Sequence, residues 1–131
     1  MIDYEQGPPP AAPVLTLNLA DEAALVRDEQ ARREIGHSAV VLAKHDDLRV
    51  VLLTLDAGAI VKKHRVEASA TLHPVEGRVR VHLPDGAIEL GVGQLLVLAR
   101  DVPHDVEALE KSAVLLSLGH ASAAEKYREE P

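Results

Sequence analysis

The sequence contains no cysteine, phenylalanine or tryptophan, and its two tyrosines, Tyr4 and Tyr127, lie near the two ends. Without cysteine, disulfide bonds and thiolate metal sites are excluded, which is compatible with a reducing cytoplasm. Any pocket must be walled by aliphatic side chains. Because such a pocket lacks aromatic stacking platforms, it is poorly suited to nucleobases or flavin rings.

Basic charge and long apolar runs are also scarce. The chain has 14 Lys and Arg against 21 Asp and Glu, a formal net charge of −7. No basic stripe offsets this charge, so we expect no nucleic-acid partner. No apolar run approaches the length of a membrane span, and the N-terminus lacks the pattern of a secretion signal. We therefore expect a cytoplasmic protein with no membrane association.

The 131 residues fit one compact domain. Residues 1–13 form a Pro-rich arm, which is either a flexible tail or a segment laid across a partner subunit. Residues 14–36 follow as an N-terminal segment with a helix, 37–120 as a barrel, and 121–131 as a charged tail.

Helix and strand patterns divide the chain near Gly36. Asp21 to Glu34 predicts an amphipathic helix against the outside of the barrel, with acidic residues at its start and Gly36 as its stop. Beyond it, about eight short β runs at regular spacing predict an all-β antiparallel sandwich or barrel. The clearest runs are 37–44, 48–55, 79–83, 88–90, 95–98, 102–108 and 113–118.

Two segments resemble the paired motifs of the cupin superfamily. In the first, Gly58 is followed after five residues by His64, and Gly77 closes the motif at the family distance. In the second, Gly93 leads to His104 at the family spacing, through the frequent ending Val-Pro-His. The resemblance covers residues 36–118. It implies a cupin double-stranded β-helix, a jelly-roll barrel with a short N-terminal helix.

The resemblance also implies a homodimer. The aliphatic exteriors of strands such as 50–55 need cover, which is consistent with a partner subunit.

The chain departs from the family pattern at the metal site. The superfamily typically holds its metal with three His and one Glu, but Val66 and Ala70 replace one His and the Glu. Only His64 and His104 remain. A catalytic metal generally needs about three protein ligands, so one divalent ion of Fe, Ni, Mn, Zn or Cu would be held weakly. The second motif also departs at three positions, Ala99, Asp101 and Ala108, where the family has Pro, Gly and Asn.

Other side chains are poorly placed to complete the site. Glu67, His73 and His82 have the opposite strand parity to the residues expected to face inward. His37 and His120 lie at the ends of elements, and sequence alone does not place them.

Three interpretations of His64 and His104 remain open. In the first, both histidines lie at the mouth of the barrel and hold no metal. In the second, they form a weak two-His metal site that water or a substrate carboxylate completes. In the third, one or both imidazoles bind or deprotonate an organic acid. Lys62 shares parity with His64, and either places an ammonium at the mouth or is a solvated strand-end lysine. Asp101 either orients His104 or is a turn residue.

The sequence therefore predicts a cupin that binds a small organic molecule in its barrel, with His64 and His104 at the polar end of the pocket. The alternative is a weakly metallated enzyme of the dioxygenase, isomerase or decarboxylase kind that uses the two histidines as metal ligands. Whether the protein is an enzyme stays open, and no catalytic residue is assigned. The predicted pocket residues are Lys62, His64, Val66, Ala70, Leu72, His104 and Val106.

Overall fold

The computed structural model describes residues 9–63 and 67–119. Within them one short helix precedes a series of strands, which confirms the predicted all-β class with an N-terminal helix. The elements in chain order are α1 (Leu19–Arg32), β1 (His37–Lys44), β2 (Leu48–Leu55), β3 (Ile60–Lys63), β4 (Ser69–Glu76), β5 (Arg78–Leu83), β6 (Gly86–Gly91), β7 (Leu96–Leu98), β8 (His104–Ala108) and β9 (Ser112–Gly119).

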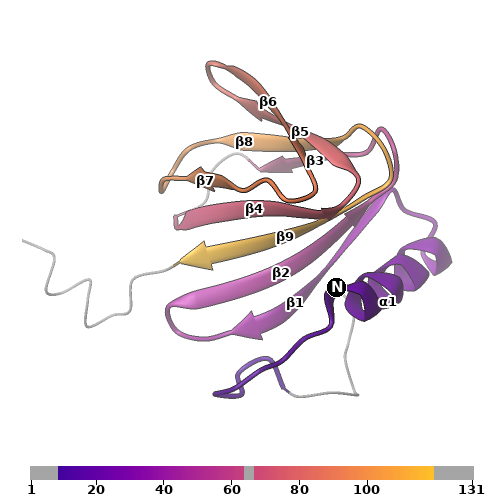
Figure 1. Cartoon of the computed structure of the whole chain (residues 1–131), viewed down its shortest axis with the longest axis vertical. Helices are drawn as coiled ribbons and strands as arrows, with labels where there is room; N and C mark the ends of the chain where they lie inside the picture. The colour runs from indigo at the N-terminus through magenta and orange to yellow at the C-terminus, as the bar shows by residue number, and fades with distance from the viewer. Residues whose placement is uncertain (1–8, 64–66, 120–131) are drawn as a thin grey trace, which may run out of the picture.

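The strands form two antiparallel sheets that face each other (Figure 1). The five-stranded sheet has the order β1-β2-β9-β4-β7, and the four-stranded sheet has the order β3-β8-β5-β6. Strand alternation directs one set of side chains from each sheet into a shared core. This core is entirely aliphatic, as the composition predicts: Leu53, Leu55, Leu72, Val79, Val81, Leu90, Leu98, Val106, Ala108 and Val114.

Helix α1 covers the outer face of the five-stranded sheet (Figure 1). Its Ala23 and Val26 are fully buried against a cluster that includes Leu52 of β2. The Thr54 hydroxyl donates a buried hydrogen bond of 2.6 Å to Oε1 of Gln30, which ties the helix to β2. The predicted position of the helix outside the barrel is confirmed. Because the exterior of β2 is covered within the chain, it no longer argues for a dimer, which stays a prediction.

The helix boundaries differ slightly from those predicted. The helix begins at Leu19, because Oδ1 of Asn18 accepts a hydrogen bond from the backbone N–H of Asp21 at 3.1 Å and caps the first turn. It ends at Arg32, and the left-handed conformation expected of Gly36 is adopted by Glu34, with φ of 53°. The predicted stop at Gly36 is therefore wrong by two residues.

The chain crosses from one sheet to the other at Gly77, between β4 and β5. Gly77 has φ of 78°, a left-handed conformation. A Cβ atom here would collide with the backbone oxygen of Lys111 and with Ser112. Only glycine fits this crossing, which gives a structural reason for the glycine that closes the first motif.

The described end of the Pro-rich arm lies on the chain's own β1–β2 connection. The backbone N–H of Lys44 donates to the Pro10 carbonyl at 2.8 Å, and Nε2 of His45 donates to the Ala12 carbonyl at 2.8 Å. In the described part of the chain, no helix has the length and apolar character needed to cross a membrane.

Candidate functional site

The strand registers bring five strands together at one end of the barrel. Strand β8 begins there with His104, which pairs with Lys63 at the end of β3. In the facing sheet, Leu48, Gly119 and Ser69 pair across three strands at the same end. We call this region the His104 end; it lies at the left in Figure 1.

A cavity of about 70 Å³ lies between the two sheets. Of the predicted pocket residues, the structure brings Ala70, His104 and Val106 together on its wall. Among the described residues that line it, His104 alone has a polar side chain, so this part of the wall is aliphatic with one imidazole. Its other lining residues are Val51, Leu53, Val61, Leu116 and Leu118.

The position of the hydrogen on the neutral His104 ring follows from the hydrogen bond of Nδ1. Nδ1 lies 3.0 Å from the Val102 carbonyl oxygen. A carbonyl only accepts, so Nδ1 carries the hydrogen and donates it. In the neutral ring Nε2 is therefore an acceptor, and within residues 9–63 and 67–119 it has no hydrogen-bond partner. His104 is only 6% exposed, and the Val102 carbonyl orients it, rather than Asp101.

Leu72 and Lys62 lie outside this cavity. Leu72 is fully buried in the core and does not line the cavity. Lys62 is exposed on the outer face of its sheet, opposite Asp105. Its predicted place at the mouth is wrong, because Val61 pairs with Val106 and takes the inward position. His64 and Val66 lie outside the described residues, so their place in the pocket stays a prediction.

None of the other histidines in the described ranges lines the cavity. His73 shares a face with Leu115, which packs under α1. Nε2 of His82 lies 2.8 Å from Oε1 of Glu107 on the outer face of the other sheet. Both therefore face outward, as strand parity predicted. His37 is exposed at the start of β1, at the opposite end from His104.

Comparisons with known proteins identify the architecture. In sequence, the chain matches no family model and no curated protein. In structure, it is similar to a cupin superfamily protein from Desulfitobacterium hafniense, with a TM-score of 0.62 and 15% identity over 65% of this chain and 78% of the other. The chain has the cupin fold. The motif resemblance is thus confirmed at the level of the superfamily fold.

Two further structures that are similar to this chain are those of named proteins. KdgF from Halomonas sp. is 27% identical over 66% of this chain and 81% of the other, with a TM-score of 0.58. A salicylate 1,2-dioxygenase from Pseudaminobacter salicylatoxidans has a TM-score of 0.72 and 16% identity, over 85% of this chain and 36% of the other. At that identity the second likeness shows the fold alone.

The residues described in this chain do not form the metal-binding site that many cupins have. No group of three or more His, Asp or Glu in residues 9–63 and 67–119 is placed to hold an ion. His104 has the tautomer of a metal-ligating histidine, because such residues usually donate their second N–H to a carbonyl or carboxylate. One imidazole does not make a metal centre, because a catalytic metal generally needs about three protein ligands.

Sequence reasoning missed Arg49, near the start of β2. It has the same parity as Val51 and Leu53, which line the cavity, and it pairs with Leu118, which also lines it. Its Nε is buried and has no hydrogen-bond partner in the described structure. The run that follows Arg49 is apolar at every position from 50 to 53, so the sequence does not indicate which face Arg49 is on, and a charged residue near a strand end normally indicates a solvated position.

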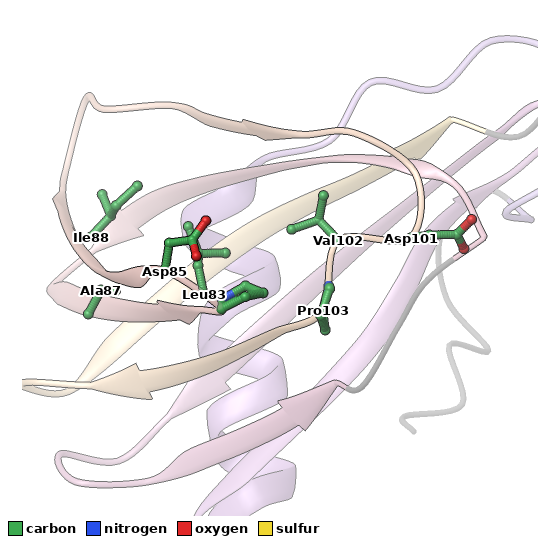
Figure 2. Close-up of a pocket in the computed structure, with 9 residues that line it drawn as sticks. Leu83, Asp85, Ala87, Ile88, Asp101, Val102 and Pro103 are labelled. Atoms are coloured by element: carbon green, nitrogen blue, oxygen red, sulfur yellow. The ribbon is translucent and has the colours of Figure 1, made fainter.

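A larger depression of about 520 Å³ lies beside the same end of the barrel, between the β5–β6 hairpin and residues 101–103 (Figure 2). Its two charged side chains do not converge: Asp85 stands on the hairpin, while the Asp101 carboxylate points away from it. Asp101 has φ of 68°, the left-handed conformation that explains the glycine usual at this motif position. Asp is among the few other residues that tolerate it.

Another depression, of about 490 Å³, lies at the C-terminal end of α1, away from His104. Its charged residues have both signs, so it favours no single ligand charge. They are Arg27, Asp28, Glu34, Asp56 and Lys111.

Proposed function

We propose that this cupin binds a small organic molecule in the aliphatic cavity, with the His104 imidazole as its polar contact. The observation that supports this is a buried histidine on an otherwise aliphatic wall, with no hydrogen-bond partner for Nε2 in the described residues. A polar group that enters the cavity would give Nε2 a hydrogen-bond partner. A ligand with a polar head and an aliphatic body would satisfy both the imidazole and the wall.

The size of the cavity limits the ligand. About 70 Å³ is well below the roughly 300–1,000 Å³ of typical small-molecule pockets. The part of the ligand enclosed by the wall is therefore a short aliphatic group of a few carbons, and the rest lies toward the His104 end.

The test uses three probes with one carbon skeleton: isobutyrate, isobutyramide and isobutylamine. We expect at least one probe to cause a saturable shift of the His104 ring Cε1–H resonance at millimolar concentration. His104→Ala should abolish binding, whereas His37→Ala, at the other end of the barrel, should retain it. If none of the three probes binds, or if His104→Ala binds as well as the parent, this function is rejected.

A weakly metallated enzyme of the dioxygenase, isomerase or decarboxylase kind is the second candidate. Its support is the His104 tautomer, which leaves Nε2 available to a metal. Elemental analysis of tag-free protein after addition of Fe, Ni, Mn, Zn or Cu tests it, with a His64→Ala/His104→Ala control. Stoichiometric metal that disappears in the double variant supports this candidate. Less than about a tenth of an equivalent contradicts it.

We also propose a cytoplasmic homodimer, on the family resemblance and the absence of cysteine. Light scattering at micromolar concentration is expected to give twice the mass of the chain. A mass near one chain would contradict the dimer.

A further inference from the structure

We propose that Arg49 makes the cavity selective for carboxylic acids. The proposal rests on the proposed binding function and adds the chemical class of the ligand. In β2, every second side chain from residue 49 onward faces the barrel interior. Val51 and Leu53 line the cavity, and Arg49 is the next residue on that face toward the His104 end.

Two cross-strand neighbours fix the position of Arg49. On one side it pairs with Leu118, a cavity-lining residue of β9. On the other side it pairs with Lys44 at the end of β1. Directly opposed residues of antiparallel strands lie on the same face of a sheet, so Arg49 stands at the rim of the cavity with a second cation beside it.

Within the part of the chain that the structure describes, the Arg49 side chain lacks the kind of partner that several other arginines have. Its Nε is buried without a hydrogen-bond partner, and the described residues provide no ion pair for its guanidinium. By contrast, Arg27, Arg78 and Arg80 each pair with a glutamate. Desolvation of a charge without a partner is unfavourable, which leaves Arg49 suited to an anion from outside the chain.

The rest of the site has the complementary composition. No Asp or Glu of residues 9–63 and 67–119 lines the cavity, although the chain as a whole has a net charge of −7. Arg49 belongs to the five-stranded sheet and His104 to the facing sheet, so one group held between them meets polar groups from both sides. A carboxylate suits Arg49, because the planar guanidinium donates two parallel hydrogen bonds to it. It accepts a hydrogen bond from Nε2 of His104 only where that imidazole is protonated, since a carboxylate and the neutral Nε2 are both acceptors. The aliphatic chain of the acid would then enter the cavity.

The test compares the affinities of isobutyrate, isobutyramide and isobutylamine for the parent protein and two variants. We expect isobutyrate to bind the parent at least about tenfold more tightly than the uncharged amide, as a charge-assisted hydrogen bond implies. Arg49→Gln should remove this preference. Arg33→Gln is the control, because it makes the same charge change at the exposed C-cap of α1 and should retain the preference.

A measurement on the parent protein avoids dependence on how the variants fold. The Arg49 Nε–H resonance should move on addition of isobutyrate and stay in place on addition of isobutyramide. Equal binding of acid and amide, an acid preference that survives Arg49→Gln, or an unmoved Nε–H resonance would overturn the role of Arg49 while leaving the binding function intact. If none of the three probes binds, the proposed function fails, and the role of Arg49 fails with it.

Discussion

The two sheets of the barrel share one core but have very different outer faces. Outside the five-stranded sheet, α1 buries an aliphatic cluster around Leu52. Outside the four-stranded sheet, charged side chains and one histidine meet in a network exposed to solvent: Arg78, Arg80, His82, Glu89 and Glu107. Burial removes apolar area from water, whereas exposed ion pairs contribute little. Outside the barrel core, we therefore expect most of the stabilising free energy to come from the outer face of the five-stranded sheet, which the helix covers.

The largest expected effect comes from truncating an aliphatic side chain on each outer face. Leu52→Ala under α1 should lower the free energy of unfolding by about 2–5 kcal/mol, because it leaves a cavity in a packed cluster. Ile60→Ala is the matched change outside the other sheet, where the side chain is 48% exposed, and should change stability by less than about 1 kcal/mol. Urea unfolding of both variants measures the difference. Equal losses would show that the helix adds no special stability.

A smaller effect is expected from the polar link between helix and sheet. Thr54→Val removes the donor to Gln30 and leaves the Oε1 of that buried side chain without its partner. The loss should be about 1–3 kcal/mol. Thr71→Val is the control, since Thr71 is only half-buried and has no side-chain hydrogen bond in the described structure. A stability unchanged by Thr54→Val would mean that the apolar cluster alone holds the helix.

The smallest effect is expected in the exposed charge network. Arg80 lies 3.4 Å from Glu89 and 3.8 Å from Glu107, so Arg80→Gln should cost less than about 1 kcal/mol, and less again at high salt. Arg27→Gln makes the same change on the covered side, where Arg27 lies 2.6 Å from Glu76 and its side chain is only 19% exposed. Unfolding at low and high salt should show the larger loss for Arg27. The reverse order would contradict the contrast between the faces.

Much of the fold could be predicted from the sequence. Strands 37–44 and 48–55 have the predicted bounds, because two mainly apolar runs on either side of a polar turn are a strong local signal. The place of His104 followed from motif spacing, and its inward direction is seen in the cavity wall.

The face of the sheet to which each β3 side chain points could not be predicted in the same way. Ile60 and Val61 are both apolar, so the pattern of this four-residue strand does not say which one faces inward. Only pairing with β8 decides it, and that pairing joins residues more than forty positions apart. The misplacement of Lys62 follows from this. Arg49 was missed for a related reason. The pairing of β2 with β1 and β9 decides to which face its side chain points.

The burial of β2 on both faces has a consequence for the unfolded chain. A strand that meets the core on one side and a helix on the other becomes a continuous uncharged run, Val50 to Leu55, with high β-propensity. Such segments promote aggregation when they are exposed during folding. Arg49 and Asp56 flank this run directly. As charged gatekeepers, they should limit association between chains before the helix closes over the sheet.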